Sequence, residues 1–454
     1  MRSPVARLVL LSSLVLLSAT ALVAPTVGTS SFQLASAVSA IEALERTADP
    51  RPHSLLDGMF DEATGLCSEG VWHNALLGTS RVLAARQLRS EGEAERAAEL
   101  LAAARLLGDS LYQLSFDGSG FRLRSNTGFW EAASDATPAI EDAGENPAFY
   151  AHSEDKHRCL PTAAAVVFYS LLAEEAEAEA EAATEAGEDD DAGSDAMTRA
   201  REVGDVFKAE FFDDRACRFR RGGGASHWRA VDQALGCLAC LRLARLGPAA
   251  GEVASSRAMA TCAADCLLRN FGYSAYATEG ADTPPGAYLG KVAPRNSWHD
   301  GLASFALLAS GVLGVGGETP AGLVRAMAAS YRCPQTKQIL HRPRELRSTS
   351  SSSSGSGDGD IGSGGDSGDG VAYTGSQALW SALVRAAELS NERSEAAGGA
   401  DVPALRAWHE AQLQQPSGLL PVANVHQDAR LWANTEWAAF VLLSKEDFDV
   451  TGRS

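Results

Sequence analysis

A phrase of sequence repeats six times along this chain, at intervals of roughly 60–90 residues. Each repeat has an Ala/Leu-rich stretch, a turn-rich segment, and a second apolar stretch that opens on aromatic and polar residues. One helical pair cannot bury its apolar face alone, so this repeat predicts pairs that pack against one another. Six pairs can close into a ring around a single cavity. The six openings are Val71–Ala75, Cys159–Ala163, Val231–Ala234, Trp298–Gly301, Thr374–Ala378 and Asn434–Ala438.

The composition favours one helical domain. The chain has 454 residues, of which 45% are hydrophobic, and alternating runs of Val, Ile and Thr are rare. A ring of six helical pairs would use most of this length, and we assign it to residues 32–445, followed by a tail at 446–454. The predicted fold class is therefore all-α.

The apolar period and the turn signals between apolar stretches set the helix boundaries. Several loops contain an aromatic or apolar residue, a turn and a second apolar residue, as in Phe116–Arg122. We expect these loops to form short β-hairpins at one end of the ring. The predicted pairs are 32–47 with 72–88, 93–114 with 162–172, 197–212 with 230–246, 252–270 with 299–313, 320–331 with 376–389, and 403–413 with 435–443.

Two polar inserts interrupt the repeats, at 175–195 and 348–370. The run from Glu174 to Asp195 holds eleven acidic residues and no basic one, so the formal net charge of −19 arises largely from such tracts. Neither insert has enough apolar residues to bury, and we expect both to be disordered. The first could instead extend a helix as a charged tail, but its acidic residues lack basic partners at i+4. The rest of the chain is mildly acidic and has no basic patch, which excludes a nucleic acid as its partner.

The N-terminus has the pattern of a signal peptide over 1–21, with two arginines, an apolar run from Leu8 and small residues before a cleavage point. The run is short for a membrane span, so we expect no stable span after cleavage. Residues 22–31 are then the remainder of a presequence or a linker. Ala21–Pro25 resembles the cleavage motif of bipartite plastid presequences. We predict entry into the secretory pathway, to a secreted or lumenal destination, with plastid delivery as the alternative.

Eight cysteines in a chain of this length do not form a disulfide scaffold. Cys237 and Cys240 form a C-x-x-C, and Cys262 and Cys266 are spaced i, i+4. These four could bind zinc, but the surrounding apolar helical pattern favours small core residues on neighbouring helices, and we expect no metal. A disulfide between these helices would suit a secretory route.

This arrangement resembles the (α/α)6 toroid of the six-hairpin glycosidases and their relatives, which include the N-acylglucosamine 2-epimerases. The resemblance covers nearly all of the chain after the presequence. Asp232–Leu238 resembles the opening of an inner helix in epimerase-like sequences, and Trp298–Gly301 and Trp432–Trp437 resemble aromatic-acid openings elsewhere in the superfamily. It implies an active cavity at the N-terminal ends of the inner helices and a carbohydrate, free or as an oligosaccharide, as the partner.

Aromatic residues concentrate at those helix openings, where five of the eight tryptophans lie. Aromatic faces stack on sugar rings while nearby polar groups bind the hydroxyls, although large aromatics could equally plug the centre of the ring. The predicted substrate-binding residues are Trp72, Trp228, Gln233, Trp298, Tyr373, Gln377, Trp432 and Asn434.

Carboxylates at the same level support glycoside hydrolysis as the first function. That reaction needs a proton donor and a second carboxylate across the scissile bond. Asp300 and Glu436 are the predicted pair, in an order that the sequence leaves open, and Asp232 is the reserve. Each of these acids could instead complement a helix dipole at a first turn.

Two histidines support a second function, because His73 and His299 open the first and fourth inner helices, which lie opposite in a six-membered ring. They could move a proton at a carbon next to a carbonyl, as a sugar epimerase or isomerase does. The alternative for each is a hydrogen-bonding or capping role. A third reading is a non-catalytic binding or scaffold protein. We expect neither a cofactor nor a metal, since His152, Asp155 and His157 are too loosely spaced. Substrate identity and oligomeric state stay open.

Overall fold

The computed structural model describes residues 71–121, 158–186, 192–222, 228–247, 249–274, 288–289, 296–314, 316–332, 339, 377–389, 421–423, 426–429 and 439. Over these residues the chain is mostly helical. The helices are α3 (Val71–Ser90), α4 (Ala94–Ser115), α8 (Cys159–Ala186), α9 (Ala192–Phe211), α10 (Ala230–Leu246), α11 (Ala250–Arg269), α12 (Ser297–Ser310), α13 (Pro320–Tyr331) and α14 (Gln377–Leu389).

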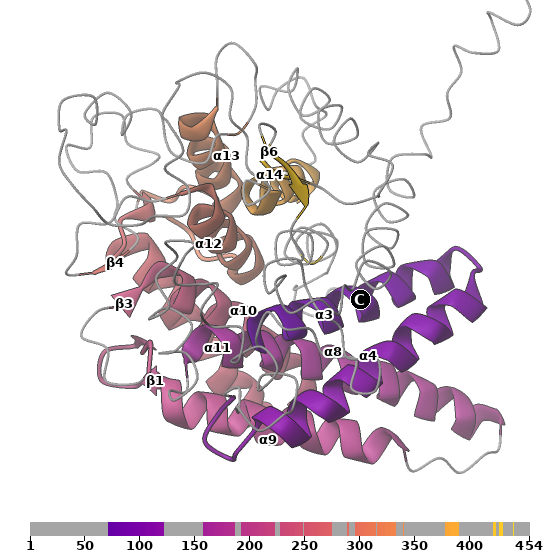
Figure 1. Cartoon of the computed structure of the whole chain (residues 1–454). Helices are drawn as coiled ribbons and strands as arrows, with labels where there is room; N and C mark the ends of the chain where they lie inside the picture. The colour runs from indigo at the N-terminus through magenta and orange to yellow at the C-terminus, as the bar shows by residue number, and fades with distance from the viewer. Residues whose placement is uncertain are drawn as a thin grey trace, which may run out of the picture.

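The helices alternate between an inner and an outer series. Helices α3, α8, α10, α12 and α14 pack in that order, each beside the next, and form the inner series. Helices α4, α9, α11 and α13 lie outside them (Figure 1). The predicted helices agree with this arrangement, and those at 230–246 and 320–331 have the observed bounds. The closest pairs are α3 with α4, α8 with α9 and α10 with α11, so in these three the inner helix precedes its outer partner. The predicted pairs of 93–114 with 162–172, 197–212 with 230–246 and 252–270 with 299–313 are therefore wrong in their partners, whereas α13 packs more closely on α14, as predicted.

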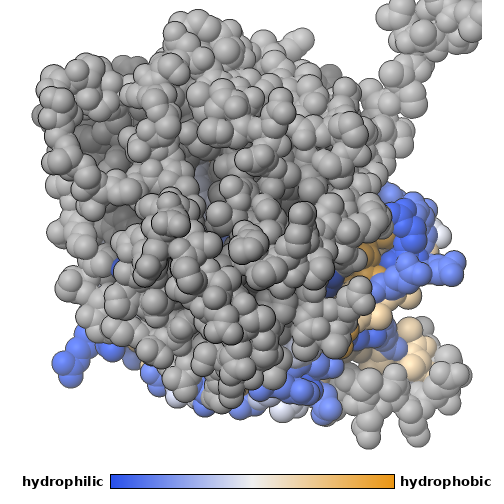
Figure 2. All heavy atoms as spheres, in the orientation of Figure 1, coloured by the Kyte–Doolittle hydropathy of each residue, from blue (hydrophilic) through white to orange (hydrophobic). Residues whose placement is uncertain are grey.

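Burial explains which helices are inner. Every residue of α10 except Arg245 is buried, because this helix has neighbours on all sides. Helix α4 instead buries one stripe at the helical period, made of Ala97, Leu100, Leu101, Ala104, Leu107 and Leu111. Its opposite face is polar and exposed. In the view of Figure 2 the visible described surface is mainly hydrophilic, with a smaller hydrophobic area at one margin.

Local signals set the ends of the later helices. The Thr319 side chain accepts a hydrogen bond from the N–H of Gly322 at the start of α13, and Pro320 occupies the first turn. Helix α12 starts at the Asn296 cap and ends at Gly311, which has a left-handed φ of 65°.

Short hairpins lie where the chain passes from an outer helix to the next inner helix. Strand β1 (Phe212–Asp213) pairs with β2 (Arg218–Phe219), and Phe116 forms an isolated bridge with Phe121. Strand β3 (Trp228–Arg229) pairs with β4 (Tyr288–Leu289), but α10 and α11 lie between them in the chain, so this pair is not a hairpin. Strands β5 (Pro421–Ala423) and β6 (His426–Ala429) form a further hairpin. The prediction of short hairpins is therefore confirmed, and the two that precede α8 and α10 lie where those inner helices begin.

The prediction that 175–195 is disordered is wrong for most of its length. Helix α8 continues to Ala186, and α9 starts at Ala192. The acidic residues at the start of this tract lack basic partners on their own helix, but neighbouring inner helices supply them. Glu174 pairs with Arg86 of α3 and with Arg242 and Arg245 of α10. Helix α8 is therefore tied to both of its inner neighbours by charge.

Glu175 adds to this network. Its carboxylate lies 2.5 Å from Nε of Arg86 and 2.9 Å from an Nη of Arg89. Burial alone would raise the pKa of Glu174, but the guanidinium groups of Arg242, Arg86 and Arg245 outweigh it and hold that pKa below its ordinary value.

The cysteines have two different roles. Cys217, on the β1–β2 turn, forms a disulfide with Cys262 of α11, so Cys262 does not pair with the C-x-x-C. Cys237 and Cys240 of α10 are fully buried, as predicted for small core residues. Among the described residues no group of three or more His, Cys, Asp and Glu is placed to hold a metal ion.

Several predicted segments lie outside the described residues. These are the signal peptide at 1–21, the linker at 22–31, the helix at 32–47, the insert at 348–370, most of the sixth pair and the tail. Within the described chain, Cys159–Thr184 is long and apolar enough to cross a membrane, but 89% of its most apolar window is buried. It is therefore a core helix of the ring.

Gly301→Ala should destabilise the ring, because α12 and α14 approach most closely there. A Cβ at Gly301 would lie 2.4 Å from both the Ala378 Cβ and the Leu379 backbone nitrogen. Backbone cannot move aside as a flexible side chain can, so we expect a loss of about 3 kcal/mol in unfolding free energy. Gly251→Ala on α11, where a Cβ meets nothing within 4 Å, is the matched control and should be neutral or stabilising. Urea unfolding measures both, and equal effects would contradict the packing.

Glu174→Gln should lower the free energy of unfolding by about 3 kcal/mol at neutral pH, since it leaves the buried Arg242 without its carboxylate. Because the folded-state pKa is depressed, the contribution of Glu174 is present above its ordinary pKa of 4.5 and is lost as the pH falls through the folded value. The variant should therefore lose less stability on acidification than the native chain. Glu177→Gln, at an exposed position of α8, should change neither quantity.

Candidate active site

The N-terminal ends of the first and fourth inner helices meet through two tryptophans. The rings of Trp72 on α3 and Trp298 on α12 lie edge to face, with centroids 6.1 Å apart and planes at 80°. Both side chains are half-buried. Edge-to-face contact at this distance is favourable for aromatic pairs. The contact spans the ring at the end where the inner helices begin.

The two candidate histidines stand beside this pair. His73 follows Trp72, with ring centroids 6.5 Å apart, and His299 follows Trp298 at 5.1 Å. Both imidazoles are half-buried. The Asn296 side chain accepts the backbone N–H of His299 at 2.9 Å, which fixes the first turn of α12. The structure therefore brings together four of the predicted site residues.

Asp300 is buried behind this end of α12. One carboxylate oxygen accepts the hydroxyl of Tyr273 at 2.9 Å, and the other accepts that of Tyr331 at 2.8 Å. The side chain has no exposed surface. Asp300 thus links α12 to the end of α13 and to the residues that follow α11, and it is not open to a ligand in this arrangement.

Asp232 has a similar buried role in α10. Both of its oxygens accept hydrogen bonds from Arg229, at 2.7 and 2.8 Å, and the residue has no exposed surface. The thiol of Cys159 donates to the backbone carbonyl of Asp232 at 3.8 Å, and burial raises the pKa of that thiol. The pair of Asp232 and Arg229 connects the start of α10 with strand β3.

The prediction that Gln233 binds substrate is wrong. Its amide oxygen accepts the N–H of Phe219 at 2.8 Å, and its amide nitrogen donates to the carbonyl of Phe219 at 2.7 Å. The side chain is fully buried. The Gln233 amide thus bonds β2 as a neighbouring strand would. It satisfies the buried N–H and C=O of Phe219 and holds the β1–β2 hairpin against α10.

Trp228 lies on β3, immediately before α10. The guanidinium of Arg218 lies over its ring, 3.9 Å from the centroid, so one aromatic face is occupied by a cation. Sequence reasoning missed Arg218 and Arg229. The i, i+3 spacing of Arg229 and Asp232 was the available signal, whereas Arg218 and Trp228 are ten residues apart in the sequence and no periodic pattern links them.

Several predicted site residues are not placed. Tyr373, Trp432, Asn434 and Glu436 lie outside the described residues. Gln377 is the first residue of α14, and its side chain is not described. Glu436, the carboxylate predicted to act with Asp300, is therefore outside the described residues.

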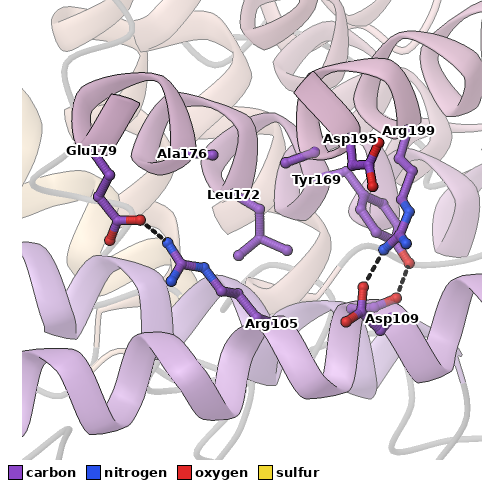
Figure 3. Close-up of a pocket in the computed structure, with 10 residues that line it drawn as sticks. Arg105, Asp109, Tyr169, Leu172, Ala176, Glu179, Asp195 and Arg199 are labelled. Carbon is purple, nitrogen blue, oxygen red and sulfur yellow. Dashed lines mark hydrogen bonds and ion pairs between the residues drawn. The ribbon is translucent and has the colours of Figure 1, made fainter. Parts of the chain in front are cut away.

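A separate cavity of about 350 Å³ lies on the outer side of the ring, between α4, α8 and α9 (Figure 3). Arg105 pairs with Glu179 at its rim, and Arg199 pairs with Asp109. Tyr169 lines it ten residues after the start of α8, which corresponds to about 15 Å along the helix. The cavity is therefore distant from the histidines.

The fold is similar to those of two solved sugar-converting proteins. A D-mannose isomerase superposes with a TM-score of 0.54 at 10% identity, over 92% of this chain and 99% of the other. The cellobiose 2-epimerase of Bacillus thermoamylovorans B4167 superposes with a TM-score of 0.56 at 9% identity, over 88% of this chain and 95% of the other. Neither the protein-family models nor the curated proteins contain a match to the sequence. The predicted (α/α)6 toroid and its epimerase-like resemblance are confirmed at the level of the fold.

Gln233→Ala should destabilise the protein without acting through a ligand. It leaves the N–H and C=O of Phe219 buried and unsatisfied, which costs about 2 kcal/mol or more. Thermal unfolding should show the loss equally with and without added sugar. Gln113→Ala, at an exposed glutamine of α4, is the control and should be neutral. A Gln233 variant of native stability that has lost sugar binding would contradict the structural role.

Proposed function

We propose that this protein is a sugar epimerase or isomerase, with His73 and His299 as its acid–base pair. The observation that carries the proposal is the contact between Trp72 and Trp298. It joins the N-terminal ends of α3 and α12, each of which presents a histidine in the next position. The likeness to a D-mannose isomerase and a cellobiose 2-epimerase supports the same class.

The chemistry needs a base and an acid near one carbon. In the open-chain form of a reducing sugar, the hydrogen on the carbon next to the carbonyl is acidic. One imidazole removes that proton, and the electron pair forms an enediolate. Return of a proton to the opposite face of the same carbon gives the epimer. If the hydroxyl proton of that carbon first passes to the former carbonyl oxygen, return of a proton to the former carbonyl carbon gives the isomer. Histidine suits both steps because its ordinary pKa is near neutral.

The tryptophans have a binding role in this proposal. Half-buried indoles at the base of the site offer apolar surface to a sugar ring, while the inner-helix N-termini offer N–H groups to its hydroxyls. Because Trp72 and Trp298 contact each other, the sugar lies above them and beside the imidazoles.

The described residues favour this reaction over glycoside hydrolysis. Asp300 and Asp232 are buried, and each uses both carboxylate oxygens within the protein. A hydrolase needs two carboxyl groups facing the scissile bond, several ångströms apart. Neither aspartate meets that requirement in this arrangement.

Turnover of reducing sugars tests the proposal. The mature protein should interconvert an aldose with its 2-epimer or its ketose, and His73→Gln and His299→Gln should each lower kcat by at least about 100-fold. Trp298→Ala should mainly raise KM, because it removes binding surface. Gln87→Ala, near the far end of α3, should behave as the native enzyme.

Two results would contradict the proposal. Release of reducing ends from oligosaccharides, abolished by Asp300→Asn or by Glu436→Gln, would establish hydrolysis instead. Sugar binding without turnover of any substrate would establish a non-catalytic binding protein.

We also propose a secretory or organellar location. The signal-like segment at 1–21 motivates it, and the disulfide between Cys217 and Cys262 supports it, because disulfides persist in oxidising compartments. A fusion of residues 1–31 to a reporter should enter the endoplasmic reticulum, and a cytosolic reporter would contradict the proposal.

A further inference from the structure

The same three-residue pattern begins the first and the fourth inner helix. Trp72–Asn74 of α3 and Trp298–Asp300 of α12 each consist of a tryptophan, a histidine and a residue with an amide or carboxylate side chain. In both helices the histidine is half-buried, whereas the residue after it is almost wholly buried. Each histidine of the proposed acid–base pair is therefore followed by a polar side chain that lies in the core.

Asp300 connects the residue beside the imidazole to two other elements. Consecutive side chains on a helix point about 100° apart, so Asp300 and His299 face different surroundings. The Asp300 carboxylate accepts the hydroxyls of Tyr273 and Tyr331 at 2.9 and 2.8 Å, and both tyrosines are fully buried. Tyr273 follows α11, and Tyr331 is the last residue of α13. Three segments of the chain thus meet at a carboxylate that is adjacent to His299.

The burial of Asp300 is not explained by helix capping. A carboxylate in the core costs free energy unless its oxygens are hydrogen-bonded. Helix α12 already has a cap, because the Asn296 side chain accepts the N–H of His299 at 2.9 Å. The first turn of a helix has few intrahelical hydrogen bonds, so tertiary contacts decide where its side chains lie. Asp300 supplies such contacts one residue away from the imidazole.

We propose that Tyr273 and Tyr331 are positioning residues for His299 and that they act through Asp300. This inference rests on the proposed function, since it concerns the geometry of the same proton transfer. Both tyrosines are fully buried, so they act on the place of the imidazole and not on the sugar. Their hydroxyls hold the first turn of α12 in one position. That position matters for the rate, because a displacement of about 1 Å in a reacting group can slow a reaction about 100-fold.

Tyr331→Phe and Tyr273→Phe test the proposal, because each removes one hydroxyl and keeps the ring. With mannose or cellobiose, whichever the native protein converts, each variant should lower kcat at least about tenfold and leave KM within about twofold. Tyr169→Phe is the matched control. Tyr169 is also buried, and its hydroxyl donates to the carbonyl of Gly108 at 2.7 Å, beside the outer cavity. This control should lose comparable stability and keep the native kcat.

A double variant shows whether the effect passes through His299. In a His299→Gln background, Tyr331→Phe should lower kcat no further, since the side chain that it positions has been removed. A further loss equal to the one in the native background would mean that Tyr331 acts elsewhere, and it would overturn the inference. If Tyr331→Phe fails to fold, Tyr273→Phe provides the same test.

Histidine NMR gives a readout that does not depend on turnover. The His299 imidazole can be assigned among the nine histidines as the signal that is absent from His299→Gln. Its chemical shifts should change in Tyr331→Phe and stay native in Tyr169→Phe.

The outcomes separate the two proposals. Native His299 shifts or a native kcat in Tyr331→Phe would overturn this inference and leave the proposed function standing. Changed His299 shifts, with no conversion of any sugar by the native protein, would support the positioning of His299 and overturn the proposed function.

Discussion

The ring depends on ion pairs buried between its inner helices. Glu174 projects from α8 toward α3 on one side and α10 on the other, and it pairs with an arginine of each. Arg242 is almost wholly buried, so removing its partner would leave an unpaired charge in the core. Close packing at glycines such as Gly301 restricts the register of these Ala/Leu-rich helices. These charges restrict it further, because they pair in one register.

This network holds the inner helices together away from their N-terminal ends. The N-terminal ends of these helices can therefore be polar. Glu174 is fifteen residues into α8, whereas the histidines and tryptophans stand in the first turn of their helices. The first turn offers unsatisfied backbone N–H groups and a positive partial charge, both useful for binding hydroxyls and anions. Buried supports such as Asp300 with its two tyrosines, and Gln233 with Phe219, hold the hairpins and helix starts in place. The residues of the proposed site are thus positioned by groups that are buried within the protein.

The repeat predicted the fold well, since period and apolar pattern record which residues are buried. The helices at 230–246 and 320–331 were located to the residue. The acidic tract was misjudged, because partners on other helices are invisible to a search for i+4 pairs. The roles of Asp300, Asp232 and Gln233 could not be predicted for a similar reason. In the sequence, a polar residue that faces the cavity from a helix start cannot be distinguished from one that faces a neighbouring loop. Its environment is determined by how the hairpins pack against the helix. The positions of His73 and His299 at the starts of the first and fourth inner helices could be predicted, because they follow from the repeat itself. Their catalytic role stays a proposal.

The central claim is that His73 and His299 exchange a proton with a sugar carbon. The most direct measurement is the incorporation of deuterium from heavy water into a reducing sugar during incubation with the mature protein, followed by NMR. We predict that the hydrogen on the carbon next to the carbonyl is replaced, and that His73→Gln and His299→Gln each suppress the replacement. A sugar that binds and keeps that hydrogen throughout, with native protein and variants alike, would contradict the account.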